Sequence, residues 1–398
     1  MKTPLKWVVV AAARPNFMKI APLLRAVKQH NRENGHLVQP ILVHTGQHYD
    51  ASMSDAFFRD LDIPDPDVHL NVGSGTHAEQ TGRVMIEFEK LLLQETPDLV
   101  IVVGDVNSTL ACALSAVKLH IPVAHVEAGL RSFDRKMPEE INRLLTDAVS
   151  DYLFTPSPDG DENLVKEGVP REKIFLVGDI MIDSLFYHLG KAKANNVKSR
   201  LSLISEEEGP ECKPYSLLTL HRPSNVDDRK ALSRILEGLL KVAERVPIIF
   251  PCHPRARKQI AAFGFDKAFQ FHQGLSLSDA DYYDRGDLKR KIHCLPPLGY
   301  LEFLNLMVDA KVVFTDSGGI QEETTVLGIP CITLRDSTER PITIAQGTNV
   351  LVHNDPEKIV REALRILDGN APKGICPEIW DGKTAQRIVK ILSSKAGR

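Results

Sequence analysis

The sequence predicts an α/β protein with two doubly wound parallel sheets, each in its own domain. Short runs of β-branched and other apolar residues alternate with longer stretches whose apolar positions recur at intervals of three and four. This alternation begins near Trp7 and starts again near Ser216. Strands that are apolar along their whole length are typical of parallel sheets, because helices cover both faces. A chain of 398 residues also exceeds the ~150 residues of one ordinary domain.

The first sheet is predicted from five short apolar runs, at residues 7–13, 41–44, 99–103, 123–126 and 152–155. Amphipathic helices are expected between them, including 20–29, 79–94 and 109–119. The run at 7–13 is a strand rather than a signal peptide, because Arg14-Pro15 follows it without a cleavage site. Together with cysteines whose spacing suits free thiols in a reducing compartment, this predicts a cytoplasmic protein.

The second sheet is predicted from runs at residues 216–220, 248–251, 292–295, 312–315 and 331–334, with a helix at 230–245. Both halves open with a strand that runs into an Arg-Pro pair, at Arg14-Pro15 and Arg222-Pro223. The domain boundary is expected near residues 177–184. A polar loop is expected at 205–213 and a charged surface insertion at 278–291.

The composition indicates a globular protein without general affinity for nucleic acid or anionic membranes. Lys and Arg number 49 against 52 Asp and Glu, which gives a net charge of −3. No uncharged apolar stretch approaches the ~20 residues that span a bilayer. Among the six cysteines the nearest pair, Cys294 and Cys331, is 37 positions apart, so the spacing gives no zinc or disulfide framework. Free thiols are expected.

The strongest local motif is a strand that runs into two glycines. After the strand at 312–315, Ser317 is placed to cap a helix, which Gly318 and Gly319 open. Free amides at a helix start bind phosphate, and glycines let such a ligand approach closely. Glu323 follows one turn later, where a carboxylate can bind ribose hydroxyls. An ordinary capped helix is the competing interpretation.

Carboxylates follow three elements of the first half. Asp105 comes directly after a buried strand, where it is a candidate base or the cap of the next helix. Glu127 and Arg131 follow the next strand, as site residues or as a structural ion pair. Pro138 opens a helix on which Glu139 and Arg143 share a face with Asn142, so Arg143 is expected to hold the Glu139 carboxylate. Such a set of carboxylates suits proton abstraction from carbon, whereas a solvated helix terminus would explain Glu139 alone.

Cations follow the strands of both halves, where a diphosphate would be bound. Taken singly, each is equally explained as a surface charge. The candidates are Arg14, Lys19, His221, Arg222, His253, Arg255 and Arg340.

No metal or redox cofactor is predicted. The pairs Cys252-His253 and His293-Cys294 lack a second ligand pair for zinc, and His44 and His48 flank a loop rather than share a helix. There is no Walker lysine loop. The segment around Gly73-Ser-Gly75 has neither the preceding strand nor the third glycine of a dinucleotide fingerprint.

Together these motifs resemble the non-hydrolysing UDP-N-acetylglucosamine 2-epimerases, and the resemblance extends from Val8 to about Asn349. It rests on Ala13-Arg-Pro-x-x-x-Lys19, Gly104-Asp105, His125-Val-Glu-Ala-Gly-Leu-Arg131, Pro138-Glu-Glu-x-Asn-Arg143, His221-Arg222, Pro251-x-His253, Thr315-Asp-Ser-Gly-Gly-x-Gln-Glu-Glu323 and Thr338-Glu-Arg-Pro341.

The resemblance implies two facing Rossmann-like domains of the glycosyltransferase B type, at 1–180 and 181–372. It also implies a C-terminal helix within 373–398 that packs back on the first domain, and a homodimer. The implied reaction eliminates UDP across C1 and C2 of a UDP-sugar and re-adds it with C2 inverted, without a cofactor. The implied acid/base residues are Asp105, Glu127 and Glu139, with His221 at the leaving diphosphate. Residues implied to bind UDP are Arg14, Lys19, Arg143, His253, Ser317, Gly318, Gly319, Glu323 and Arg340, with Phe303 near uracil.

Two departures from the family pattern bear on the substrate. Asn16 stands where glutamate is common, and Asp50 stands where the regulated bacterial enzymes have the second glutamine of a Gln-x-x-Gln motif, although Gln47 matches the first. The pattern therefore does not favour activation by a second UDP-N-acetylglucosamine. It resembles a branch that includes unregulated enzymes and epimerases of UDP-diacetamido uronic acids.

Three competing functions use similar motifs. A UDP-sugar glycosyltransferase of the same fold would share the UDP-binding half, a hydrolysing epimerase would release UDP and free N-acetylmannosamine, and a nucleotide-sugar sensor would need no carboxylates. Retention of Asp105, Glu127 and Glu139 argues against the glycosyltransferase and the sensor.

Overall fold

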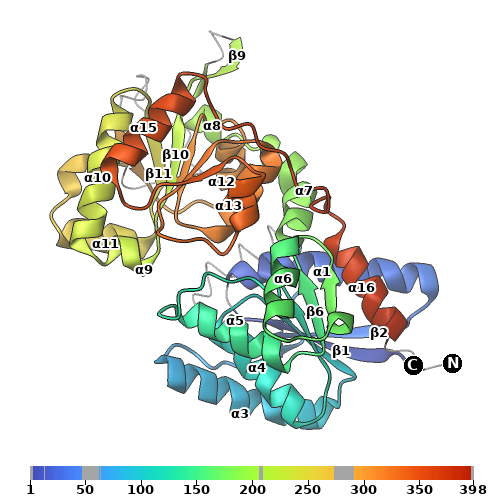
Figure 1. The fold of residues 1–398 in the computed structure, drawn as a ribbon. Coiled ribbons are helices and arrows are strands. Elements are labelled where there is room, and N and C mark those ends of the chain that lie inside the picture. The colour runs from blue at the N-terminus through green and yellow to red at the C-terminus, as the bar shows by residue number, and fades with distance from the viewer. Residues whose placement is uncertain are drawn as a thin grey trace. The chain divides into compact units, whose positions relative to one another are not determined.

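The computed structural model describes residues 3–12, 14–46, 62, 64–205, 209–272 and 291–395. The chain divides into two compact units (Figure 1). Unit 1 combines Met1–Tyr187 with Glu378–Arg398, and unit 2 is His188–Pro377. The chain passes from unit 1 to unit 2 within helix α7 (Ile180–Lys193).

Unit 1 contains a seven-stranded sheet in the order β3-β2-β1-β4-β5-β6-β7, and all of its neighbouring strands are parallel. The order reverses between β1 and β4, as in doubly wound folds. The strands are β1 (Leu5–Ala11), β2 (Val38–His44), β3 (Val68–His69), β4 (Leu99–Val103), β5 (Val123–Val126), β6 (Tyr152–Thr155) and β7 (Ile174–Leu176).

Helices and one short 3₁₀ turn connect these strands. They are α1 (Arg14–Asn34), α3 (His77–Glu95), α4 (Asn107–Lys118), α5 (Pro138–Val149), α6 (Pro158–Lys166) and η1 (Arg171–Lys173). The last helix, α16 (Thr384–Lys395), lies against α1 in the same unit (Figure 1).

The core of unit 1 forms because β-branched residues on its strands meet apolar stripes on the helices. Val10 and Val102 share one cluster with Phe88 of α3 and Cys112 of α4, and all four side chains are almost completely buried. Burial of apolar surface is the main stabilising contribution of such a cluster. Trp380, far along the chain, is also buried, and its Nε1–H donates to the carbonyl oxygen of Pro156 at 2.8 Å.

Unit 2 contains a second seven-stranded parallel sheet, in the order β12-β13-β11-β10-β14-β15-β16. Here the order reverses between β10 and β14. The strands are β10 (Ser216–Thr219), β11 (Ile248–Pro251), β12 (Phe269–Phe271), β13 (Ile292–Leu295), β14 (Val313–Thr315), β15 (Cys331–Thr333) and β16 (Asn349–Leu351).

Helices also cover the sheet of unit 2. They are α8 (Val197–Arg200), α9 (Pro223–Val226), α10 (Arg229–Ala243), α11 (Pro254–Ala262), η2 (Asp266–Ala268), α12 (Tyr300–Met307), α13 (Gly318–Leu327), α14 (Pro341–Ala345) and α15 (Pro356–Leu367). Helices α10 and α15 pack against each other, and their buried apolar side chains join the core of the sheet: Leu232, Ile235, Leu239, Ile359 and Ala363.

The predicted fold class is confirmed, since both units are α/β with a parallel, doubly wound sheet. All ten predicted strands are present, but the short strands β3, β7, β12 and β16 were not predicted. The polar loop expected at 205–213 was wrong, because β8 (Ile204–Ser205) and β9 (Gly209–Cys212) pair there as an antiparallel ribbon. Of the expected insertion at 278–291, all but the last residue lies outside the described residues, as do Gln47, His48 and Asp50.

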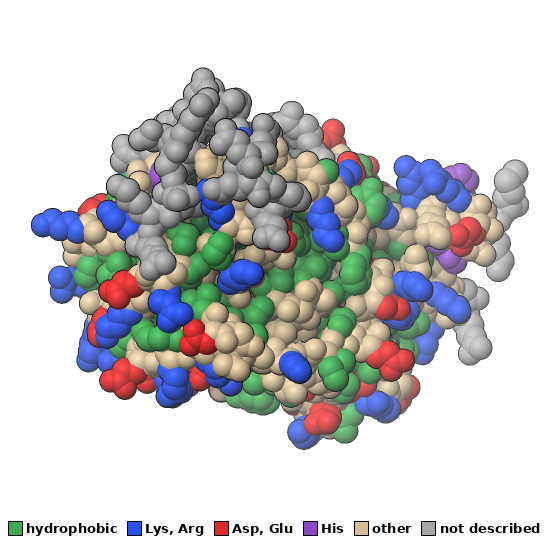
Figure 2. Space-filling view, turned by 90° about the horizontal axis from the view of Figure 1, so that it is seen from above, with side chains coloured by type: hydrophobic (Ala, Val, Ile, Leu, Met, Phe, Trp, Pro, Cys, Tyr) green, Lys and Arg blue, Asp and Glu red, His purple; other side chains and the backbone are tan. Residues whose placement is uncertain are grey.

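The surface carries both signs of charge. On the face drawn in Figure 2, basic and acidic side chains are interspersed. Within the part of the chain that the structure describes, no helix is both long and apolar enough to span a membrane.

Candidate active site

The carboxyl ends of β1, β4 and β5 come together at the reversal point of the first sheet. Gly104, directly after β4, has a φ of +70°, a backbone conformation that glycine adopts without strain. A Cβ atom there would lie 3.1 Å from Lys19 Nζ and 3.6 Å from Glu127 Oε2. Lys19 forms a buried ion pair with Glu127, and Asn16 donates to the Val103 carbonyl oxygen at 2.9 Å. The structure therefore brings Lys19, Gly104 and Glu127 into one cluster.

Asp105 is held by Arg143 of helix α5. Arg143 Nη1 donates to Asp105 Oδ2 at 2.5 Å, and the Asp105 side chain is one-third exposed while Arg143 is buried. Asn142 donates to the Asp105 carbonyl oxygen at 2.9 Å. Asp105 does not cap α4, because the N-cap residue of that helix is Val106. The carboxylate is thus oriented by a cation and still accessible.

The expected pairing of Arg143 with Glu139 was wrong. Arg143 pairs with Glu140, through Nη2 at 2.6 Å and Nε at 3.1 Å to Oε2. Glu140 lies three positions before Arg143 on the buried side of α5, and it also accepts from the Ser132 and Phe133 amides at 2.9 Å each. Glu139 is half-buried in the first turn. In the described part of the chain, no other side chain is recorded as its partner.

Burial acts to raise the pKa of Glu140, but the Ser132 amide and the Arg143 guanidinium outweigh it and hold that pKa below the usual range. Glu140 is therefore a structural anion that fixes Arg143.

Arg131 does not pair with Glu127, contrary to the ion-pair interpretation. Its guanidinium binds Asp147 of α5 at 2.7 Å and Glu167 at 2.7 Å. Lys19, one turn into α1, supplies the cation for Glu127 instead. Asp147 also lies 2.6 Å from Nδ1 of the buried His125. Spacing along one strand end does not reveal ion-pair partners that lie on separate helices, as Lys19 and Asp147 do.

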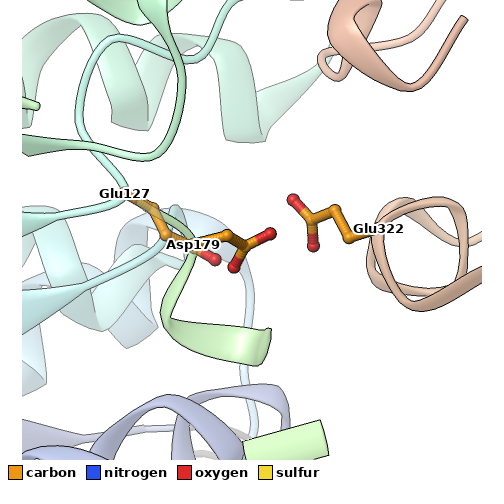
Figure 3. A group of neighbouring side chains, drawn as sticks. All are labelled: Glu127, Asp179 and Glu322. Carbon is orange, nitrogen blue, oxygen red and sulfur yellow. The ribbon is translucent and has the colours of Figure 1, made fainter. Parts of the chain in front are cut away.

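Asp179 is a buried carboxylate near this cluster that the sequence analysis missed. It precedes α7, and its Oδ1 accepts from the Met181 amide at 2.8 Å. A carboxylate oxygen of Asp179 lies within 4.8 Å of a carboxylate oxygen of Glu127. Figure 3 shows these two side chains next to each other. Gly178-Asp179 follows strand β7 after one intervening residue, Val177, much as Gly104-Asp105 follows β4, and that repeated Gly-Asp pair was the available signal.

The charges around these carboxylates bear on metal binding. Glu127 is paired with the Lys19 ammonium, which occupies the place that a cation would take. Glu322, the third residue labelled in Figure 3, belongs to unit 2 and is paired there with Arg340. The cations on Glu127 and Glu322 suit anion binding and proton transfer better than metal coordination.

In unit 2, Asp316 fixes the loop after β10. Asp316 is completely buried after β14 and accepts from the amides of His221 and Arg222 and from the side chain of Asn225, at 2.9–3.2 Å. His221 Nδ1 lies 3.1 Å from Asp316 Oδ1, and the ring is 45% exposed. Burial works to raise the pKa of Asp316, but the hydrogen bonds and charge of the His221 loop keep it below its usual range. His221 therefore presents an oriented ring to solvent.

The start of helix α13 is surrounded by a buried network of charges. Glu339 is paired with Arg335 and lies close to Arg340 and Arg222, which lower its pKa despite burial. Arg340 also pairs with buried Glu322. A Cβ atom on Gly318 would lie 2.8 Å from Glu339 Oε1, so any side chain at this helix start would displace the Glu339 carboxylate. Ser317 is the N-cap residue, but its side chain makes no capping bond.

Glu323 is a second buried carboxylate on α13. Burial raises the pKa of Glu323 to about 7, although the Tyr300 hydroxyl donates to its carboxylate at 2.7 Å and by itself lowers that pKa. Tyr300 opens α12, which also carries the half-buried Phe303. A buried carboxyl group with a pKa near neutrality, such as that of Glu323, is a candidate functional residue.

The other predicted residues take different positions. His253 is exposed and caps α11, because its Nδ1 accepts from the Arg255 amide at 3.2 Å. Arg255 pairs with Asp227 near the surface. Gly319 is half-buried in the first turn of α13. The Arg14 side chain lies outside what the structure describes.

The chain matches a family model described as UDP-N-acetylglucosamine 2-epimerase over residues 29–393. A UDP-N-acetylglucosamine 2-epimerase from Methanocaldococcus jannaschii is 42% identical over 98% of this chain and 99% of that protein. A Pseudomonas aeruginosa UDP-2,3-diacetamido-2,3-dideoxy-D-glucuronate 2-epimerase is 41% identical, with the same coverage. The crystal structure of the M. jannaschii enzyme with UDP-GlcNAc and UDP superposes with a TM-score of 0.83 at 43% identity, covering 98% of this chain and 100% of that one.

Proposed function

The chain belongs to the UDP-N-acetylglucosamine 2-epimerase family of isomerases, and we propose that it converts UDP-N-acetylglucosamine to UDP-N-acetylmannosamine without hydrolysis. The observation that carries this proposal is the cluster at the reversal point of the first sheet. There Asp105 and Glu127, each paired with a cation, lie at the carboxyl ends of β4 and β5. A sensor or a simple nucleotide-binding protein has no need of such a pair of oriented carboxylates.

The proposed reaction has an elimination and an addition. A base removes the C2 proton, the C1–C2 double bond forms, and the C1–O bond breaks so that UDP leaves with the bonding electron pair. UDP then re-adds at C1 of the 2-acetamidoglucal, and a proton returns to the opposite face of C2. Inversion therefore needs proton-transfer groups on both faces of C2. We assign these roles within the set Asp105, Glu127 and Glu139.

We assign UDP binding mainly to unit 2. A departing diphosphate needs cations and backbone amides, and unit 2 offers His221, Arg340 and the start of α13 at Gly318 and Gly319. Asp316 supports this role because it orients His221. We also assign ribose-hydroxyl binding to Glu323, contact with uracil to Phe303, and a further cationic contact with UDP to His253.

The remaining assigned residues lie in unit 1. We propose that Arg14, Lys19 and Arg143 contribute positive charge toward the phosphates. Lys19 and Arg143 also hold Glu127 and Asp105, so their substitution is expected to affect the carboxylates as well. By analogy with the family we further propose a homodimer, which light scattering coupled to gel filtration tests directly.

A second substrate is supported by the comparisons. The P. aeruginosa diacetamido-glucuronate epimerase is as similar to this chain as the N-acetylglucosamine enzyme of M. jannaschii, at 41% and 42% identity. The reaction would be the same, since both names describe inversion at C2. The sugar is therefore tested with both UDP-sugars in parallel.

The test is proton NMR of the purified protein with each UDP-sugar in heavy water. The proposal expects deuterium at C2 and accumulation of the epimer with UDP still attached. Release of free N-acetylmannosamine and UDP would instead identify a hydrolysing epimerase. Binding of both UDP-sugars without exchange at C2 would contradict the epimerase proposal and favour a glycosyltransferase.

A further inference from the structure

His125 is a buried histidine to which the proposed reaction gives no role. Its ring is completely buried between strand β5 and helix α5. Nδ1 lies 2.6 Å from Asp147 Oδ1, and Nε2 lies 2.9 Å from the carbonyl oxygen of Gly104. Both ring nitrogens thus have a partner at hydrogen-bond distance.

Both partners of the ring are hydrogen-bond acceptors. A carbonyl oxygen only accepts, and an ionised carboxylate only accepts. Asp147 also accepts from the Gly129 amide at 3.0 Å and pairs with Arg131 at 2.7 Å, which are partners of the ionised form. Burial works to raise the pKa of Asp147, but His125 and Arg131 more than compensate and lower it. Each ring nitrogen must therefore carry a proton to make its bond.

The two bonds of His125 connect the three elements that carry the acid/base candidates. Gly104 directly precedes Asp105, and His125 stands two residues before Glu127 on the end of β5. Asp147 lies on α5, the helix that begins with Glu139 and carries Arg143.

The Gly104 peptide is also held from its other side. Its amide donates to the Val126 carbonyl oxygen at 3.1 Å, while its carbonyl accepts from His125. Two successive residues of β5 therefore fix the turn from which Asp105 projects.

We propose that His125 is a doubly protonated positioning residue that fixes Asp105, Glu127 and Glu139 relative to one another. This inference rests on the proposed function for the roles of those carboxylates. The groups that face the ring are Asp147 from α5 and the Gly104 carbonyl from the β4 turn, and Arg131 reaches the ring only through Asp147. A neutral ring would leave one of the two acceptors without a proton.

The first test is nitrogen NMR of the full chain with ¹⁵N-labelled histidine, without substrate. The His125 ring is assigned by the signal that disappears in His125→Gln, and by its contacts with the backbone protons of β5. We expect both ring nitrogens to carry a proton in the folded protein, one for the Asp147 carboxylate and one for the Gly104 carbonyl oxygen. A ring with one unprotonated nitrogen at neutral pH would overturn the proposal.

The second test is the kinetics of His125→Gln. Glutamine carries both of its N–H donors on one nitrogen, whereas the two acceptors lie at different nitrogens of the His125 ring, so glutamine cannot reach Gly104 and Asp147 together. We expect kcat to fall by about 100-fold, the cost of a misplacement of about 1 Å, while the UDP dissociation constant stays unchanged. A folded variant with kcat within about threefold of wild type would overturn the positioning role.

The matched control is Asp151→Ala. Asp151 accepts from the Val123 amide at 3.1 Å, at the opposite end of the same strand, so the variant also removes a polar support of β5. It should lose stability but keep kcat. If wild type shows no C2 exchange with either UDP-sugar, the proposed function fails, whereas the nitrogen spectrum still decides the protonation of His125. If His125→Gln does not fold, that spectrum of the wild type remains decisive.

Discussion

Replacement of Arg143 by methionine tests whether the buried charges of helix α5 hold unit 1 together. Methionine preserves much of the side-chain length but removes the guanidinium. The variant breaks two bonds to Glu140, at 2.6 and 3.1 Å, one to Asp105 at 2.5 Å and one to the Ser132 hydroxyl at 3.4 Å. Glu140 is 1% exposed, so its charge would remain in the interior without a counter-ion.

The expected cost follows from what Glu140 retains. Removal of one partner of a buried ion pair costs about 3–5 kcal/mol. Glu140 keeps the amides of Ser132 and Phe133 and the Ser132 hydroxyl, at 2.9–3.0 Å, so we expect about 3 kcal/mol, the lower end of that range. The double variant with Glu140→Gln should recover about 2 kcal/mol, because the uncompensated charge is removed.

The assay is urea unfolding followed by tryptophan fluorescence. The sequence has 2 tryptophans, Trp7 and Trp380, and both are buried in unit 1, so the signal reports that unit alone. The matched control is Arg171→Met, since Arg171 pairs with Asp161 but is 67% exposed. It should change stability by less than about 0.5 kcal/mol.

The pH dependence gives a second check on the same variant. The pKa of Glu140 is depressed in the folded protein, so its stabilising effect is present above about pH 4.3 and is lost as the pH falls through the folded value. The deficit of Arg143→Met should therefore shrink as the pH falls below about 4.3. A loss below about 1 kcal/mol at neutral pH, or additive effects in the double variant, would refute the reasoning.

Three further predictions concern the remaining site residues. Glu139→Gln should lower kcat by about 10²–10⁴-fold and leave UDP affinity intact by calorimetry, and full activity would remove Glu139 from the chemistry. Arg340→Ala should weaken UDP binding by about 10–100-fold, because a charged hydrogen-bond donor is lost, and an unchanged dissociation constant would exclude Arg340 from the site. Glu323 has a folded pKa of about 7, raised by burial, so its stabilising effect is complete below about pH 4.3 and is lost as the pH rises through 7. The protection factors of the α13 amides, which correct for faster intrinsic exchange at high pH, should therefore be lower at pH 8 than at pH 5 in wild type, and Glu323→Gln should reduce this difference. Equal differences in both proteins would show that another group is responsible.

The strands of both sheets were predictable because a run of consecutive apolar residues must be buried on all sides, as a strand of a parallel sheet covered by helices is. Val8–Val10 and residues 99–103 are buried on both faces, as uniform apolar runs imply. The missed strands are short: Val68–His69 has two residues and Asn349–Leu351 has three. Runs of that length have no periodicity to detect, and they become strands because a neighbouring strand offers free backbone groups.

The positions of the candidate site residues at strand ends were predictable from the sequence, and their pairings less so. Strand ends placed Asp105 and Glu127 correctly, since parallel strands bring their carboxyl ends to one edge. Sequence spacing paired Glu127 with Arg131, but their actual partners, Lys19 and Asp147, come from helices α1 and α5. Spacing also paired Arg143 with Glu139, whereas Arg143 binds Glu140. Helical spacing is compatible with Arg143 pairing with either Glu139 or Glu140. Arg143 pairs with Glu140 because that side chain is buried beside it, and burial is not visible in the sequence.

The discontinuity of unit 1 sets an order for synthesis on the ribosome. Asp183 accepts from the amides of Thr384 and Ala385, at 3.0 and 2.8 Å, and Trp380 fills the core near Pro156. These contacts need residues that are translated after all of His188–Pro377. The first unit to begin emerging is therefore the last to be completed, and until then the nascent chain exposes the apolar surface that Trp380 and α16 later cover.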